Sequence, residues 1–267
     1  MQLPISILPG DTRMEYIAEV MAKKGGTVCS SWSDMPDSGY LICGIPFTRD
    51  GRMVNTSISD PLSIRSFLGM LTGSHIIIGG NLSKNVISYC TYHGIKYYDV
   101  MTSPAFVSKN ARLTAEGLLI PLLSKTTFSI CDCRVLLAGY GNCGKEIADI
   151  LQLFTNDIYI YDTNPAAMKA AKSRHFKTVS EKELRDRNHS VHQINIIINT
   201  SPVNPFHNQV WESFSSNCTI FNIASFALKL PRPLSERVFD CPGIPGKYAP
   251  KTAGHIIAKE ICNHFKL

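Results

Sequence analysis

Three glycines in the middle of the chain, Gly139, Gly141 and Gly144, follow an apolar run at residues 134–138 and open a segment with helical periodicity. A strand, a glycine turn and a helix in this order are the context of a dinucleotide-binding motif. The first glycine permits the tight turn, the second lets the backbone approach a pyrophosphate, and the third lets the helix pack closely on the strand. The N–H groups at the start of the helix would bind the phosphates.

An acidic residue stands where the ribose of a dinucleotide is recognised. Asp162 ends the next apolar run, at residues 158–161, and Thr163 follows it. A carboxylate there accepts hydrogen bonds from both ribose hydroxyls and repels a 2′-phosphate. NAD is therefore favoured, and NADP is the alternative because basic side chains at residues 169–177 could reach a phosphate.

Further cofactor contacts are expected at the ends of later strands, since ligands of open parallel sheets bind beyond the carboxyl ends of the strands. A strand-terminating turn would explain these later residues equally well. Cys143 lies at a helix start that could activate its thiol, but packing beneath the cofactor is favoured over a nucleophilic role. The predicted cofactor contacts are Gly139, Tyr140, Gly141, Asn142, Cys143, Gly144, Asp162, Thr163, Asn199, Thr200, Ser201, Pro202 and Ala224.

Short apolar runs alternate with amphipathic stretches along the chain, which predicts an α/β fold with mostly parallel sheets. The expected strands are residues 4–8, 40–45, 75–78, 96–100, 134–138, 157–162, 177–179, 194–199 and 219–223, and the expected helices of the first half are residues 13–24, 61–71 and 82–93.

A polar stretch at residues 101–112 interrupts this alternation and marks the expected crossing between two domains. A helix is expected to begin near Thr114, with Thr-Ala-Glu-Gly as its cap. A final helix at residues 252–264, with Thr252 as its N-cap, is expected to return to the first domain. The expected domains are residues 1–111 with 252–267, and residues 112–251.

The composition excludes several classes of protein. A length of 267 residues favours two domains, and 44% hydrophobic with 18% charged residues indicates packed cores rather than disorder. The longest apolar runs are too short for a membrane span and residues 1–8 lack a basic start, so a cytoplasmic protein is expected. The net charge of +6 forms no polybasic run, which favours small anionic ligands over nucleic acid. The nine cysteines show no metal-ligand spacing and indicate reduced thiols without a metal.

Four segments resemble the dipicolinate synthase A chain family of spore-forming bacteria. They are Pro9-Gly-Asp-Thr-Arg13, Thr114-Ala-Glu-Gly117, the glycine turn at residues 139–144, and Pro245-Gly-Lys-Tyr-Ala-Pro-Lys-Thr-Ala-Gly254. The last is the most specific, and the order and spacing of the four hold across nearly the whole chain.

The resemblance implies a flavodoxin-like first domain, a Rossmann second domain, and oxidation of dihydrodipicolinate to pyridine-2,6-dicarboxylate by an NAD(P)-dependent oxidoreductase during sporulation. It places the protein in the cytoplasm of the mother cell and implies a flavoprotein-like partner, the dipicolinate synthase B chain, with a homo-oligomer left open. The family is associated with the phosphorylated cofactor, and Asp162 departs from that association.

A dicarboxylate substrate needs cations and hydroxyls around it, because charge-assisted hydrogen bonds to carboxylates are strong. The predicted substrate contacts are Asp11, Arg13, Arg112, Thr114 and Thr252, and the predicted catalytic residues are Lys251, Glu116 and His255.

Several alternatives to these site residues stay open. Asp11 could instead hold its turn or pair with Arg13, Glu116 could cap a helix, and water could be the base. At the level of function, the alternatives are a dehydrogenase of the 2-hydroxyacid or alanine dehydrogenase type and a non-catalytic nucleotide-binding regulatory protein.

Overall fold

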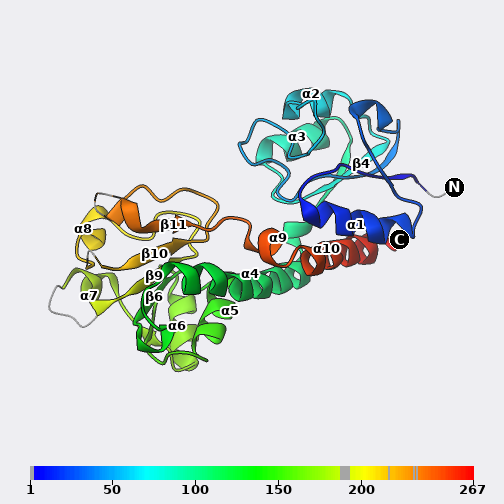
Figure 1. Cartoon of the computed structure of the whole chain (residues 1–267). Helices are drawn as coiled ribbons and strands as arrows, with labels where there is room; N and C mark the ends of the chain where they lie inside the picture. Colours follow the sequence, from blue (N-terminus) through cyan, green and yellow to red (C-terminus); the bar gives the residue numbers. More distant parts are fainter. Residues whose placement is uncertain (1–2, 187–192, 216, 231, 233) are drawn as a thin grey trace. The chain divides into compact units, whose positions relative to one another are not determined.

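The computed structural model describes residues 3–186, 193–215, 217–230, 232 and 234–267. The chain divides into two compact units. Unit 1 contains Met1–Lys109 and Gly246–Leu267, and unit 2 contains Asn110–Pro245 (Figure 1). Each unit is built on one parallel sheet. Within the described part of the chain, no helix is long and apolar enough to cross a bilayer.

The sheet of unit 1 has the strand order β2-β1-β3-β4-β5, which is the flavodoxin-like order. Its side chains alternate between two covered faces. Leu41 packs with α2 and α3, whereas the next residue, Ile42, packs with α1 and α10. The elements are β1 (Ile5–Ile7), α1 (Thr12–Ala22), β2 (Thr27–Val28), η1 (Trp32–Asp34), β3 (Gly39–Ile42), α2 (Ile64–Gly69), β4 (His75–Gly79), α3 (Lys84–Tyr92), β5 (Lys96–Asp99), η2 (Val100–Thr102) and α10 (Pro250–Phe265).

The sheet of unit 2 has the order β11-β10-β9-β6-β7-β8, which is the Rossmann order with β6 as its first strand. Leu137 faces the side covered by α4, α5 and α6, and Leu136 faces α7 and α8. The elements are η3 (Ile130–Asp132), β6 (Val135–Ala138), α5 (Asn142–Leu151), β7 (Ile158–Tyr161), α6 (Pro165–Ser173), β8 (Lys177–Thr178), α7 (Glu181–Arg185), β9 (Ile196–Asn199), α8 (Asn208–Trp211), β10 (Thr219–Asn222), η5 (Leu234–Arg237) and β11 (Val238–Asp240), and α4 (Pro104–Lys125) and α9 (Ile244–Tyr248) cross the unit boundaries.

The last helix, α10, packs against α1 in unit 1 (Figure 1). At Gly254 a Cβ atom would lie 2.7 Å from the Arg13 carbonyl oxygen and 2.7 Å from the Tyr16 Cβ, so glycine is what lets the two helices approach. The predicted fold class is therefore confirmed, including the return of the final helix to the first sheet. The prediction of Thr252 as N-cap is wrong, because Pro250 opens the helix and Ala249 is the N-cap.

The helix expected to begin near Thr114 starts much earlier, at Pro104. The Ser103 hydroxyl accepts a hydrogen bond from the Phe106 N–H at 3.3 Å, so the polar stretch opens α4 instead of forming a loop. Thr114 lies inside the helix and donates to the Asn110 carbonyl at 2.8 Å. The expected capping role of Thr114 and Glu116 is therefore wrong.

Two strands were not expected from the sequence, β2 and β11. Both residues of β2 are exposed, and β11 is only partly buried. They lie at sheet edges, where apolar periodicity is weak because neither face is deeply covered.

Candidate functional site

The glycine turn connects β6 to α5. Two of its glycines pack so closely against neighbouring atoms that no side chain would fit there. Gly139 has φ 104°, and a Cβ atom there would overlap the Thr200 hydroxyl. A Cβ atom on Gly144 would overlap the Gly139 carbonyl oxygen. At Gly141, in contrast, a Cβ atom would have no described atom within 4 Å. The turn is thus open at Gly141, which fits a pyrophosphate approaching the backbone there.

The first turn of α5 begins directly after this opening. Gly141 is the N-cap residue and has no side chain to cap the helix. The N–H groups of the first turn are therefore available to an anion. Asn142 is exposed, and Cys143 is half-buried. Burial raises the pKa of the Cys143 thiol, against a lowering by its hydrogen bond with Thr114, which favours packing over a thiolate role.

Asp162 follows β7 and is bound to the glycine turn. Its Oδ2 accepts from the Tyr140 N–H at 2.6 Å, and its Oδ1 accepts from the Asn164 N–H at 2.8 Å. The Tyr140 ring is buried, so this residue offers only its backbone to the turn. Thr163, next to Asp162, is exposed. The carboxylate is held beyond the carboxyl end of β7, the position at which Rossmann folds recognise a ribose.

A row of polar side chains joins the carboxyl ends of three neighbouring strands. Asn199, Asn222 and Asp240 end β9, β10 and β11 in register. Asn199 Nδ2 donates to Asn222 Oδ1 at 2.9 Å, and Asn222 Nδ2 donates to Asp240 Oδ1 at 2.7 Å. Both asparagines are fully buried. Asn222 and Asp240 were missed in the sequence, because only strand register aligns them with Asn199 in one row.

This row holds the two loops predicted to line the cofactor. Asn199 Oδ1 accepts from the Ser201 N–H at 3.1 Å, and Asn222 Nδ2 also donates to the Phe226 carbonyl at 2.6 Å, just beyond Ala224. The Thr200 hydroxyl donates to the Gly139 carbonyl at 3.1 Å. The structure therefore brings the segment after β9 into contact with the glycine turn. Pro202, in the same loop, is exposed.

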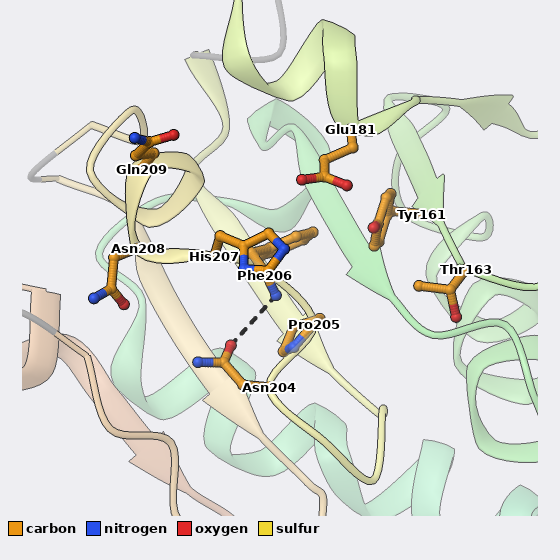
Figure 2. A pocket seen from close by; sticks show the side chains of 9 residues that line it. All are labelled: Tyr161, Thr163, Glu181, Asn204, Pro205, Phe206, His207, Asn208 and Gln209. Atoms are coloured by element: carbon orange, nitrogen blue, oxygen red, sulfur yellow. Dashed lines mark hydrogen bonds between the residues drawn. The ribbon is translucent and has the colours of Figure 1, made fainter.

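A cavity of about 540 Å³ lies beyond the carboxyl end of β7. Figure 2 shows Tyr161, Thr163 and Glu181 on one side of it and the loop of residues 204–209 on the other. Asn204 orders this loop, because its Oδ1 accepts from the Phe206 N–H at 3.3 Å and from Trp211 Nε1 at 2.9 Å. No sequence motif marks the loop, so the cavity was not predicted.

The predicted substrate residues at the start of α1 bind each other. Asp11 accepts from Arg13 Nε at 2.9 Å and from Nη2 at 2.6 Å, and Arg13 also donates to the Ile45 carbonyl. The Arg13 side chain is only 9% exposed. Burial alone would raise the pKa of the Asp11 carboxyl, but the hydrogen bonds and charge of Arg13, with Arg49, hold it below its usual value. The pairing alternative is thus the arrangement found.

The first and fourth motifs meet in unit 1. A Cβ atom on Gly246 would lie 2.7 Å from Arg13 Nε, so the fourth motif covers the guanidinium. Lys251 and Thr252 are exposed in the first turn of α10. His255, one turn later, is half-buried with its ring edge-on to Tyr16, with the two ring centroids 6.0 Å apart.

The remaining predicted residues lie on α4 in unit 2. Arg112 and Glu116 are exposed and pair at 3.1 Å, and Arg112 Nη1 lies 3.6 Å from Glu146 Oε2. Thr114 is buried. The structure thus groups Asp11, Arg13, Lys251, Thr252 and His255 in one unit, and Arg112, Thr114 and Glu116 in the other.

Comparison with known proteins gives one curated relative and several similar folds. No family model matches the chain. The dipicolinate synthase A chain of Bacillus subtilis is 26% identical over 283 residues, covering 96% of this chain and 93% of that protein. The crystal structure of the Bacillus subtilis dipicolinate synthase A chain superimposes with a TM-score of 0.83 at 20% identity, covering 100% of this chain and 96% of that one.

The dipicolinate synthase A chain from Bacillus halodurans gives a TM-score of 0.85 at 16% identity, covering 99% and 98% of the two chains. A transhydrogenase from Sinorhizobium meliloti gives 0.64 at 11% identity, covering 98% and 93%. The resemblance predicted from the four sequence motifs is thereby confirmed. In sequence and in fold, this chain is similar to the dipicolinate synthase A chain.

Proposed function

We propose that this chain is an NAD(P)-dependent oxidoreductase that dehydrogenates dihydrodipicolinate to dipicolinate during sporulation. The observation that carries the proposal is the resemblance to the dipicolinate synthase A chain over 96% of the sequence. The glycine turn, open at Gly141 and flanked by Asp162, supports a nucleotide cofactor. We also propose a cytoplasmic location in the mother cell and a flavoprotein-like partner, similar to the dipicolinate synthase B chain.

The residues of unit 2 would bind the cofactor from end to end. The N–H groups of the first turn of α5 bind the pyrophosphate, and Asp162 binds the adenosine ribose. The cavity beside Thr163 receives the adenine, since it lies beyond the carboxyl end of β7, next to Asp162. The loop of residues 199–202 and Ala224 line the nicotinamide half, which supplies the hydride acceptor.

The Asp162 carboxylate favours NAD over NADP. Two backbone N–H groups hold the carboxylate at the ribose position. A 2′-phosphate beside it would be repelled, while the two hydroxyls of an unphosphorylated ribose can donate to it.

Aromatisation removes a hydride and a proton from the ring, and the proton needs an acceptor. Glu116 and His255 are the candidate bases, with water as the alternative. Lys251, exposed in the first turn of α10, would bind a substrate carboxylate. Arg112 is the weaker candidate for that contact, because its guanidinium already forms ion pairs with Glu116 and Glu146.

The proposal is tested by assaying the whole chain with dihydrodipicolinate and either NAD or NADP, with and without the candidate partner. We expect reduced nicotinamide and the ultraviolet absorbance of the pyridine ring to appear together, with NAD preferred. Turnover of lactate-like acids instead would identify a 2-hydroxyacid dehydrogenase. A thermal shift with nucleotide but no turnover of either substrate would identify a regulatory protein.

A further inference from the structure

Two loops of unit 1 meet at the point where the strand order of its sheet reverses. The helix after β1 packs on one face of the sheet, and the helix after β3 packs on the other. In open α/β sheets, ligands bind at such a switch point, beyond the carboxyl ends of the strands. Asp11 lies in the loop after β1, and Arg49 lies in the loop after β3.

Arg49 is held from two sides although its side chain is 60% exposed. Its Nη2 donates to Asp11 Oδ2 at 3.2 Å, and its Nε donates to Asn55 Oδ1 at 3.0 Å. Asn55 is fixed in turn, because its Nδ2 donates to the Pro46 carbonyl at 2.7 Å. An exposed arginine normally keeps its rotamer freedom, whereas two hydrogen bonds restrict this one.

The loop that carries Arg49 is also ordered. Asp50 Oδ1 accepts from the backbone N–H groups of Arg52 and Met53 at 2.8 and 2.9 Å. The Thr48 hydroxyl accepts from the Gly51 N–H at 3.0 Å. The backbone under Arg49 is therefore a closed turn.

Among Asp11, Arg13 and Arg49, two guanidinium groups share one carboxylate, which leaves one positive charge, on the exposed side. Asp11 neutralises one of its two arginines, and the Arg13 guanidinium is buried between Asp11 and the Ile45 carbonyl. Arg49 keeps donors for a ligand, since its Nη1 has no partner among the described residues. A planar guanidinium with donors left on one edge matches the two oxygens of a carboxylate.

We infer that Arg49 binds a carboxylate group of the substrate, with Asp11 and Asn55 as its positioning residues and Arg13 as their buried support. This inference rests on the proposed function for the identity of the substrate, a pyridine-type dicarboxylate. It moves the ligand contact predicted for Arg13 to an arginine that the sequence motifs do not include.

The experiment measures binding of dipicolinate, picolinate and inorganic phosphate to the whole chain by isothermal titration calorimetry. We expect Arg49→Ala to weaken dipicolinate binding at least about tenfold, because a charge-assisted hydrogen-bonded contact is lost. Arg49→Lys recovers part of the affinity, since lysine keeps the positive charge but lacks the planar pair of N–H donors that bind both oxygens of a carboxylate. Arg52→Ala is the matched control, because it removes the same charge from an exposed side chain of the same loop.

Equal losses in Arg49→Ala and Arg52→Ala would overturn the inference, because they would show a general charge effect. So would unchanged affinity in Arg49→Ala, absence of dipicolinate binding by the wild type, or Arg49-dependent binding of phosphate in place of dipicolinate. The two proposals fail separately. Arg49-dependent binding without oxidation rejects the proposed reaction alone, and oxidation with an unchanged KM in Arg49→Ala rejects the carboxylate contact alone.

Discussion

Gly144 and Gly141 belong to one turn but face different surroundings. A methyl group on Gly144 would overlap the Gly139 carbonyl oxygen, whereas one on Gly141 would point into open space. We expect Gly144→Ala to lower the free energy of unfolding by about 1–3 kcal/mol, the usual cost of overpacking. Gly141→Ala should leave it unchanged and instead reduce the thermal shift given by NAD. Both are measured by thermal unfolding with and without nucleotide, and equal behaviour of the two variants would contradict this account.

At Asp162, a single charge is expected to decide between the two nicotinamide cofactors. Asp162→Asn keeps an acceptor for the Tyr140 N–H and removes the negative charge that repels a 2′-phosphate. We expect the ratio of kcat/KM for NAD to that for NADP to fall at least about tenfold, or about 1.4 kcal/mol. Asp157→Asn, just before the other end of β7, is the control and should leave the ratio unchanged. An unaltered ratio in Asp162→Asn would refute the assignment.

At the scale of the elements, side-chain hydrogen bonds connect the carboxyl ends of β9, β10 and β11. Asp240→Ala removes an acceptor of Asn222 Nδ2, a fully buried group. Leaving part of a buried amide unpaired costs about 1–3 kcal/mol. We expect a loss of stability of this size in urea unfolding, together with a raised KM for the nucleotide, because the loops after β9 and β10 lose their anchor. Asp132→Ala, at an exposed carboxylate of η3, is the control, and a stability loss without any change in KM would contradict the link to the loops.

Helix α4 shows at the same scale how local signals can mislead. The sequence of its first turns resembles a polar linker because several of their side chains are polar and exposed, although Phe106 is buried, and the Ser103 cap and Pro104 begin the helix. The sequence Thr-Ala-Glu-Gly resembles a cap, yet the Thr114 hydroxyl is satisfied by the Asn110 carbonyl one turn earlier. Capping residues thus predict a helix start only when the preceding residues are not already helical.

For the molecule as a whole, paired carboxylates predict sensitivity to acid. Asp157 lies 2.7 Å from Arg134 Nε and pairs with Lys177. Burial would raise its pKa, but hydrogen bonds and charge from these two cations outweigh burial and lower it. A lowered folded-state pKa stabilises the fold above the unfolded pKa of about 4 and loses that contribution as the pH falls through the folded value.

We therefore expect the free energy of unfolding to fall as the pH drops from about 5 toward 2, which urea titrations at each pH would measure. Asp157→Asn should be less stable than the wild type at pH 7, with the difference shrinking as the pH falls through the lowered folded-state pKa of Asp157, because neither side chain is charged below it. A difference that stays constant across this range would show that packing, not charge, links Asp157 to stability.

Much of this protein can be predicted from the sequence because the signals are local. The spacing of Gly139, Gly141 and Gly144 after an apolar run predicts the turn between a strand and a helix from a short stretch of sequence. The alternation of apolar runs and amphipathic stretches predicts the α/β class. The four motifs predict the resemblance to the dipicolinate synthase A chain, which the comparison finds at 26% identity over 96% of this chain.

The tertiary structure decided what depends on distant residues coming together. Strand register placed Asn222 between Asn199 and Asp240, and no local pattern encodes register. Packing under Gly246 buries the Arg13 side chain, whereas the Arg49 side chain stays 60% exposed, although both are arginines near a turn. Residue type sets which chemistry a side chain can do, but exposure and neighbours, which only the packed chain defines, set which side chain is free to do it.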